Sequence, residues 1–582
     1  MFRKVLIANR GEIAVRIIRS LREMNITSVA AFSDADRDAL FVQAADESYR
    51  LGPAPAGESY LSVRALLEVA AQAHVDAVHP GYGFLAENAE FARAVQGAGL
   101  TFIGPSEQAL RTMGNKVAAR GSVGSLGVPL VPGSDGTIES LEEARAVGDE
   151  IGYPLAVKAA GGGGGRGIRV VWKREELAEA LESSSREAAA YFGNADVYLE
   201  RYFPNPRHVE VQVLGDLHGN LVHLGERDCS VQRRHQKLIE ESPSPAVGTE
   251  LRNRMGDAAL RAARSVDYSS AGTVEFLLTP EGDFYFLEMN TRIQVEHPVT
   301  EWVTGVDLIR EMVLAAAGES ISVRQSFERL NGHAIEVRVN AEDPLHGFQP
   351  DPATITSYRE PGGFGTRVDS GVYAGFTISA VYDSLMAKVI VWGEDRESCR
   401  RRALRALKEY RVVGPVTTLS FSVAVLEHPV FAAGEATTSF LEDYGDELHV
   451  PADSRAGEHL EFSAPAVRGE PRLFDVEVDR RFYRVRVAEL QNDARRSGPR
   501  RQSTSRTKRA LSGTSLLSPL HGTVVAIRKK AGDEVSVGEP LFVIEAMKME
   551  NEIPAHRSGV LSAIHIQIGD TVETDQQLAV IQ

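Results

Sequence analysis

The C-terminal part of the chain contains an internal repeat, and this repeat constrains the fold more than any other feature. "GTVVAIRKKAGDEVSVGEPLFVIE" from Gly522 aligns without gaps with "GVLSAIHIQIGDTVETDQQLAVIQ" from Gly559. Each copy has short apolar runs and a Gly-Asp pair, which predicts short strands joined by tight turns. Two such halves should pack as a two-fold-related flattened β-barrel. The connecting segment "AMKMENEIPAHRS" then places Lys548 at an exposed turn between the halves.

The Lys548 turn resembles that of the biotinyl/lipoyl carrier family. The surrounding "EAMKMEN" is similar to biotin carriers, whereas lipoyl domains usually lack the flanking methionines. The resemblance implies biotin joined by an amide to Lys548, attached by a biotin protein ligase. Before this domain, "RRSGPRRQSTSRTKR" holds seven basic residues and no acidic one. We interpret it as a flexible tether that moves the carrier, in preference to a nucleic-acid patch.

The bulk composition narrows the class of protein. At 582 residues the chain requires several domains. A net charge of −16 argues against a general nucleic-acid binder, and the presence of only two cysteines fits a reducing cytoplasm. No apolar run reaches the roughly 18 residues of a membrane span. We therefore expect a cytoplasmic protein that binds neither nucleic acid nor membrane.

The first part of the chain alternates strands and helices. "KVLIANR" predicts a buried strand, "GEIAVRIIRSLREM" a helix and "ITSVAAFS" the next strand, a pattern typical of a Rossmann-like, doubly wound parallel sheet. The predicted organisation is α/β and α+β multidomain. Its parts are the Rossmann-like subdomain 1–113, an α+β domain 114–330, a mixed subdomain 331–446, a small β-rich region 447–494, the basic linker 495–513 and the carrier 514–582.

A phosphate-binding loop is predicted after one central strand. "YPLAVKAAGGGGGRGIRVV" contains Lys158, then five glycines that include Gly163, Gly164 and Gly165. Glycines allow the backbone to approach phosphate oxygens, and the lysine adds positive charge. No G-K-[ST] follows, so this is not a Walker loop.

A pair of glutamates points to a divalent metal site. "GTVEFLLTPEGDFYFLEMN" predicts two strands joined by a two-residue loop at Glu281-Gly282, which places Glu275 opposite Glu288. Two like charges in this position destabilise a sheet unless a cation bridges them. Mg²⁺ is commonly held by two carboxylates together with substrate phosphates.

Polar residues then recur at every second position: Glu288, Asn290, Arg292, Gln294 and Glu296. If the chain stays extended, all five point to one side. An arginine suits a planar oxyanion such as bicarbonate, and Glu296 could act as the base that removes its proton.

These motifs, together with "NRGEIAVRI", "HPGYGFLAEN" and "ERDCSVQRRHQKLIEESP", resemble biotin carboxylase, an ATP-grasp enzyme, over about residues 1–446. The resemblance implies that Lys116 and Lys158 bind ATP phosphates and that Glu200 meets the adenine side. It implies that the nucleotide pocket is lined by His208, Gln232 and His235. Lys237 would contact the transferred phosphate, and Mg²⁺ (or Mn²⁺) would be held by Glu275, Glu288 and Asn290.

For the second half of the reaction, the resemblance implies that bicarbonate is bound by Arg292, Gln294 and the Val295 backbone. Glu296 would be the base, Arg338 would stabilise the biotin enolate, and Asp383 would complete the pocket. The implied reaction passes through carboxyphosphate, which breaks down to CO₂ and phosphate before biotin is carboxylated.

The whole chain therefore resembles the α subunit of an acyl-CoA carboxylase of the acetyl- or propionyl-CoA type, with a role in fatty acid biosynthesis. Such a subunit would form a homo-oligomer within an α/β assembly. Its carboxyltransferase β subunit would be a separate chain, for which the 447–494 region is the candidate docking element. Three alternatives remain: another ATP-grasp ligase, a non-catalytic lipoyl carrier, and pyruvate carboxylase. The last places a long transferase barrel between the two ends, and there is no room for one here.

Overall fold

The computed structural model describes residues 1–134, 136–159, 168–192, 196–324, 330–451, 467–478, 481–490, 514–519, 522–546, 549–572 and 576–582. The chain divides into two compact units, Met1–Asp453 and Ser454–Gln582. None of the helices in these described segments is both long and apolar enough to cross a membrane.

The N-terminal part is a five-stranded parallel sheet, as predicted. Its strand order is β3-β2-β1-β4-β5, and every neighbouring pair is parallel. The strands are β1 (Lys4–Ile7), β2 (Thr27–Ser33), β3 (Glu47–Gly52), β4 (Ala77–His79) and β5 (Thr101–Phe102). Its helices are α1 (Gly11–Glu23), α2 (Leu40–Ala44), α3 (Val63–Ala73), α4 (Ala89–Gly97) and α5 (Glu107–Gly114). The apolar face of α3 packs on the sheet through Leu66 and Val69, which explains the hydrophobic period of that helix.

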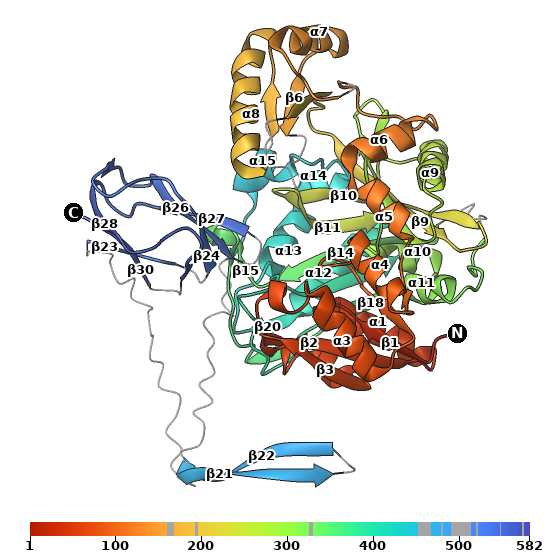
Figure 1. Cartoon of the computed structure of the whole chain (residues 1–582), viewed down its shortest axis with the longest axis vertical. Coiled ribbons are helices and arrows are strands. Elements are labelled where there is room, and N and C mark those ends of the chain that lie inside the picture. Colours follow the sequence, from red (N-terminus) through yellow and green to blue (C-terminus); the bar gives the residue numbers. More distant parts are fainter. Residues whose placement is uncertain are drawn as a thin grey trace. The chain divides into compact units, whose positions relative to one another are not determined.

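A single eight-stranded antiparallel sheet forms the centre of the larger unit (Figure 1). Its strand order is β13-β12-β9-β10-β11-β14-β19-β18. The sheet therefore includes strands from the predicted subdomain 331–446 as well as from 114–330. The strands are β9 (Arg207–Gly215), β10 (Leu221–Arg233), β11 (Gln236–Ser242), β12 (Ser270–Leu278), β13 (Phe284–Asn290), β14 (His333–Asn340), β18 (Thr366–Ser370) and β19 (Leu385–Gly393). One face packs on α6 (Lys116–Gly124) and α9 (Thr249–Arg264) through apolar residues such as Val209 and Met255.

A smaller sheet, β7-β6-β8, has its own hydrophobic core. Its strands are β6 (Leu155–Ala159), β7 (Ile168–Val171) and β8 (Val197–Arg201), and its helices are α7 (Leu141–Ile151) and α8 (Leu177–Phe192). The two helices lie together beside β6 (Figure 1).

The remaining helices of this unit are α10 (His297–Thr304), α11 (Leu308–Ala316), α12 (Arg396–Glu409), α13 (Leu419–Glu427), α14 (Pro429–Ala433) and α15 (Phe440–Tyr444). Short strands form two further pairs, β15 (Glu342–Asp343) with β16 (Gln349–Pro350) and β17 (Ser357–Arg359) with β20 (Arg411–Val413).

The C-terminal repeat forms the predicted two-fold β-barrel. Its two four-stranded sheets are β23-β30-β28-β25 and β27-β26-β24-β29. The strands are β23 (Ser515–Leu517), β24 (Gly522–Ile527), β25 (Glu534–Val535), β26 (Pro540–Ala546), β27 (Met549–Pro554), β28 (Gly559–Ile564), β29 (Thr571–Val572) and β30 (Gln577–Ile581). Repeat-equivalent strands occupy the same place in each sheet, and the equivalent pairs Val535/Val572 and Leu541/Leu578 are buried in one core.

The backbone conformation of the Gly-Asp turns explains why each copy of the repeat has a glycine there. Gly532 and Gly569 have φ of +101° and +96°, a backbone conformation that strongly favours glycine. Strands β26 and β27 pair as far as Ala546 and Met549. The predicted attachment residue, Lys548, lies outside the described residues.

In the 447–494 region, β21 (Val467–Val478) pairs antiparallel with β22 (Arg481–Leu490), in agreement with the β-rich composition predicted there.

Candidate active site

The β12–β13 hairpin brings together the two glutamates predicted to hold a metal. Glu275 pairs with Glu288 across the two strands. The loop prediction was wrong: Leu278 pairs with Phe284 and the Thr279 amide bonds the Asp283 carbonyl, so three residues form the tip. A β-bulge next to Glu275 shifts the register back by one residue, and this restores the predicted pairing.

The electrostatics of this pair suit a divalent cation. Desolvation by the surrounding protein and the neighbouring Glu275 carboxylate raise the pKa of Glu288 above its usual value, although its side chain keeps access to solvent. Within the described part of the chain Glu288 makes no side-chain hydrogen bond. Asn290 donates to the Glu275 carboxylate over 2.8 Å. Two opposed carboxylates, one of them open to a ligand, match the oxygen donors that Mg²⁺ requires.

The polar stripe after Glu288 converges, although the backbone does not stay extended. Strand β13 ends at Asn290, and Glu296 is the residue before helix α10. The condition on which the one-sided arrangement was expected, a continued extended chain, therefore does not hold. Side-chain hydrogen bonds still join the stripe, because Arg292 donates to Asn290 over 2.9 Å and to Gln294 over 3.1 Å. Gln294 in turn donates to Glu275 over 2.9 Å.

Lys237 is the cation at the centre of three carboxylates. Its Nζ lies 2.5 Å from Glu210, 2.6 Å from Glu296 and 3.0 Å from Glu275. Burial alone would lower the pKa of Lys237, but these carboxylates raise it well above its usual value. The ammonium therefore persists in a buried position and offers positive charge where Glu275 and Glu296 meet.

Arg338 approaches Glu296 from the opposite side. Its guanidinium donates to Glu296 over 2.9 Å and to Glu240 over 2.6 Å. Burial raises the pKa of Glu240 to about 7, against the opposing effect of Arg338. Glu296 is fully buried, and although burial raises its pKa, Lys237 and Arg338 leave it below the usual value. Glu296 is thus a carboxylate at neutral pH, the protonation state that a general base needs.

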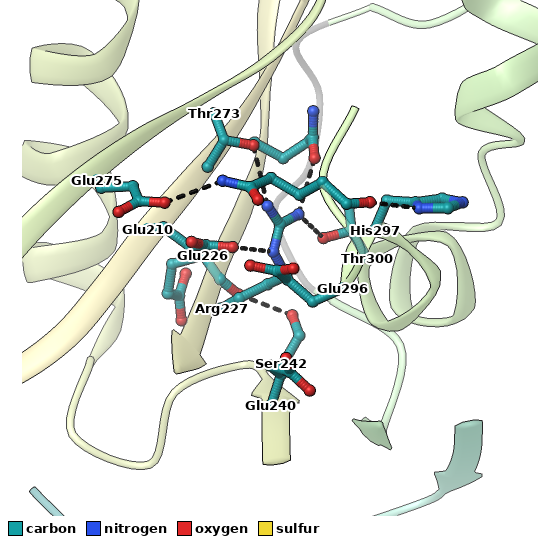
Figure 2. Close-up of polar contacts among 12 residues, drawn as sticks. Glu210, Glu226, Arg227, Glu240, Ser242, Thr273, Glu275, Glu296, His297 and Thr300 are labelled. Atoms are coloured by element: carbon teal, nitrogen blue, oxygen red, sulfur yellow. Dashed lines mark hydrogen bonds and ion pairs between the residues drawn. The ribbon is translucent and has the colours of Figure 1, made fainter. Parts of the chain in front are cut away.

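Arg227 on β10 is joined by side-chain hydrogen bonds to strand β9, strand β12 and helix α10 (Figure 2). Its side chain is fully buried. It donates to Glu210 over 2.6 Å and to Gln212 over 2.7 Å. Two further bonds of 3.0 Å reach Thr300 on α10 and Thr273 on β12. Arg227 therefore fixes the position of Glu210, which in turn contacts Lys237.

The predicted nucleotide-binding residues come from both sheets and from helix α6. Lys158 on β6 forms an ion pair with Glu200 on β8, and Arg120 also donates to Glu200 over 2.6 Å. Lys116, at the start of α6, acts electrostatically on Glu288 and partly opposes the rise in the pKa of that carboxyl group. His208 lies 3.0 Å from Glu275. Burial alone would lower the pKa of His208, but the Glu275 carboxylate raises it to about 9.

Three further predicted residues differ in their surroundings. Gln232 is buried and pairs with Lys237 across β10 and β11, whereas His235 is exposed at the turn between these strands. Asp383 is exposed and acts electrostatically on Tyr82, as Arg338 does. Gly163, Gly164 and Gly165 lie outside the described residues.

Sequence reasoning missed several residues of the cluster, chiefly Glu210, Arg227 and Glu240. A signal for Glu210 was present, because His208, Glu210 and Gln212 alternate with valines in β9. Such alternation marks a polar face on an otherwise apolar strand. Arg227 and Glu240 carried no comparable pattern, since their partners come from distant strands of the sheet.

Known families match the chain in four consecutive segments. The biotin carboxylase N-terminal domain matches residues 1–110, and the carbamoyl-phosphate synthase L chain ATP binding domain matches 115–324. The biotin carboxylase C-terminal domain matches 336–443, and the biotin-requiring enzyme family matches 514–581.

Similar proteins cover the larger unit. Biotin carboxylase 1 of Bacillus subtilis is 53% identical over 445 residues, which are 76% of this chain and 99% of that protein. A pyruvate carboxylase subunit of Methanothermobacter thermautotrophicus is 50% identical over 444 residues, 76% of this chain and 90% of that protein. A solved structure, the biotin carboxylase domain of Hydrogenobacter thermophilus 2-oxoglutarate carboxylase with MgADP, ADP and bicarbonate, is 46% identical with a TM-score of 0.73. The match covers 78% of this chain and all of that domain.

Fold and site together define an ATP-grasp ligase fused to a carrier domain. The chain belongs to the biotin carboxylase family, whose members carboxylate biotin with ATP and bicarbonate, and it also contains its own biotin/lipoyl-type carrier domain.

Proposed function

We propose that this protein is the α subunit of an acyl-CoA carboxylase. It would carboxylate biotin on its own Lys548, for delivery to acetyl-CoA or propionyl-CoA on a separate carboxyltransferase β subunit. The observation that carries the catalytic part is the convergence of Lys237 and Arg338 on Glu296, next to the opposed pair Glu275 and Glu288.

The nucleotide and metal occupy one side of the site in this proposal. Mg²⁺ would be held by Glu275 and Glu288, assisted by Asn290, and would neutralise charge on the ATP phosphates. Lys116, Lys158 and the glycines 163–165 would bind those phosphates, while Lys237 would contact the phosphoryl group that is transferred. Glu200, His208, Gln232 and His235 would line the nucleotide pocket.

Bicarbonate would lie between Glu296 and the side chains of Arg292 and Gln294. Arg292 already contacts Asn290 and Gln294, so the Arg292 guanidinium is held in place for a planar anion. Glu296 removes the bicarbonate proton, and the bicarbonate oxygen then attacks the γ-phosphorus as ADP leaves. The product, carboxyphosphate, breaks down to CO₂ and phosphate in a site lined with fixed positive charges.

Biotin would supply the ureido nitrogen that accepts the carboxyl group, and the N–H proton of that nitrogen would pass to the phosphate released from carboxyphosphate. Arg338 is positioned to stabilise negative charge next to Glu296, from which its guanidinium lies 2.9 Å away. Asp383 would contribute to the biotin side of this pocket, since Asp383 and Arg338 both act on Tyr82. A biotin protein ligase would attach the cofactor beforehand.

The proposal is tested by self-labelling. Purified biotinylated protein with MgATP and labelled bicarbonate should acquire acid-labile label on the protein. A Lys548→Arg variant should acquire none, because an arginine cannot form the amide bond to biotin. Lys529→Arg provides a matched control on the same carrier domain, where the lysine forms only a partly exposed ion pair with Glu539. No label on protein whose mass shows attached biotin would contradict the proposal.

The metal assignment makes a separate prediction. In Glu288→Gln, the Mg²⁺ concentration required for half-maximal ATP cleavage should rise by about tenfold or more, because one of two carboxylate ligands loses its charge. Glu281→Gln, at the exposed tip of the same hairpin, should leave the requirement unchanged. Titration of activity with Mg²⁺ at constant free ATP measures both; an unchanged requirement in Glu288→Gln would remove this residue from the metal site.

A second candidate acceptor is a 2-oxo acid. One of the similar proteins is a pyruvate carboxylase subunit that matches over 90% of its own length. The short connection between residue 446 and the carrier therefore does not by itself distinguish an acyl-CoA carboxylase from a pyruvate carboxylase made of separate subunits. That match covers 76% of this chain, which also contains residues 514–581 of carrier type. The β21–β22 hairpin lies in sequence between the biotin carboxylase part and the carrier, and it is the candidate docking element for the transferase. We also propose that the chain forms a homo-oligomer within the α/β assembly. Incubating labelled protein with candidate transferase chains and either acyl-CoA or pyruvate identifies the acceptor.

A further inference from the structure

The turn that carries Glu296 is held in place by two buried side chains. Between the end of β13 at Asn290 and the start of α10 at His297, the chain belongs to neither a strand nor a helix. His297 contacts the Gln294 carbonyl over 2.7 Å. Lys388 donates to the next carbonyl, that of Val295, over 2.7 Å. Both side chains are fully buried, so neither contact competes with water.

Lys388 belongs to β19, on a different part of the sheet from the hairpin. It pairs with Arg338 on β14 and with Asp369 on β18. Strand β14, which carries Arg338, is therefore the direct neighbour of strand β19, whose Lys388 donates to the Val295 carbonyl. A displacement of Lys388 would alter the turn next to Glu296 without removing any group that contacts it directly.

A charge partner for Lys388 comes from the N-terminal subdomain. The Lys388 ammonium lies 3.1 Å from the Glu12 carboxylate on α1. Tyr82 also donates a hydrogen bond to Glu12. Burial alone would lower the pKa of Lys388, but the carboxylates of Glu12 and Glu336 raise this pKa above its usual value. The Lys388 side chain therefore stays a charged ammonium. Burial raises the pKa of Glu336 well above the usual value, and both of its oxygens lack a hydrogen-bond partner among the described residues. Glu12 is the ion-pair partner by geometry, since its carboxylate oxygen lies within 3.1 Å of the Lys388 ammonium.

We propose that Lys388, neutralised by Glu12, is a positioning residue for bicarbonate activation. It fixes the Val295 carbonyl, and so the peptide that joins Val295 to Glu296, in the orientation that bicarbonate and its base require. Lys388 does not contact the reacting atoms. This inference rests on the proposed function, because it assigns bicarbonate to the Arg292–Glu296 turn.

The first test separates bicarbonate from ATP. In Lys388→Met, kcat/KM for bicarbonate should fall by about 100-fold, the order expected when a catalytic group is misplaced by about 1 Å. KM for MgATP and the slow bicarbonate-independent ATP cleavage should change less than twofold, since the nucleotide groups are elsewhere. Lys408→Met, which removes an exposed lysine of α12 paired with Glu427, is the matched control. A fall of less than twofold in Lys388→Met would overturn the proposal.

A second variant separates positioning from folding. Lys388→Met leaves Glu12 as an unpaired buried charge, which lowers stability by itself. The double variant Glu12→Gln/Lys388→Met removes both charges and keeps an acceptor for Tyr82. It should melt closer to the wild type than Lys388→Met does, yet still use bicarbonate poorly. Recovery of both stability and bicarbonate use in the double variant would overturn the proposal. Wild-type protein without bicarbonate-dependent ATP cleavage would instead refute the proposed function.

Discussion

Replacing Glu296 by glutamine is expected to lower bicarbonate-dependent ATP cleavage at least 1,000-fold, within the range of about 10² to 10⁴ for loss of a general base. Glutamine keeps the size of the side chain and a carbonyl oxygen for Lys237, but it cannot accept the bicarbonate proton. Binding of MgATP, measured by calorimetry, should stay within a few-fold of the wild type, because the nucleotide groups are intact. Coupled ADP release with and without bicarbonate measures the effect.

Glu240→Gln is the matched control for this experiment. Glu240 is equally buried and contacts the same guanidinium of Arg338, but Lys237 donates its hydrogen bonds to Glu210, Glu275 and Glu296 and none to Glu240 among the described residues. Its loss should reduce ATP cleavage far less than Glu296→Gln does. Equal losses in the two variants, or retained cleavage in Glu296→Gln, would show that Glu296 is not the base.

Replacing Arg227 by methionine is expected to lower the free energy of unfolding by about 3–5 kcal/mol, the cost of breaking a buried ion pair from one side. Methionine fills much of the same volume, but Glu210 loses its arginine contact, and Gln212, Thr273 and Thr300 lose a donor (Figure 2). Urea unfolding followed by circular dichroism measures the change.

Arg111→Met is the control for solvent exposure. Arg111 on α5 also contacts two carboxylates, those of Glu90 and Glu107, each over 2.7 Å. Its side chain is 52% exposed, and such surface pairs contribute little, on the order of 0–1 kcal/mol. A loss in Arg227→Met no larger than that in Arg111→Met would mean that the buried network adds nothing to stability.

The fold could be predicted from sequence where the pattern is local. The carrier barrel followed from a repeat whose equivalent residues, such as Val535 and Val572, are both buried in the structure. The parallel sheet followed from alternating strands and helices. The joining of β11 to β14 could not be predicted in this way, because the pairing of Glu240 with Glu336 brings together residues with no shared sequence pattern.

The site could likewise be predicted where its contacts are local in sequence, and not where they join distant strands. The opposition of Glu275 and Glu288 was predicted from one hairpin, although a longer loop and a bulge were both needed to produce it. Lys388 occurs in "YDSLMAK" together with Asp383, but nothing in the sequence indicates that its partner is the Val295 carbonyl. Contacts of this kind depend on the order of strands in the sheet, which is set by packing of the whole unit.

The single eight-stranded sheet has a consequence for how this enzyme can be altered. Strands of that sheet supply Glu210, Lys237, Glu275, Arg338 and Lys388, whereas Lys158 and Glu200 belong to the separate sheet β7-β6-β8 with its own core. As proposed, Lys158 and Glu200 would reach the nucleotide from the small sheet, so this part of the nucleotide pocket could be altered, by selection or by a protein engineer, without changing the strands that supply Glu275 and Arg338. His208 and Gln232, the nucleotide residues proposed on β9 and β10, belong to the large sheet, so only the part of nucleotide binding that the small sheet supplies is separately adjustable.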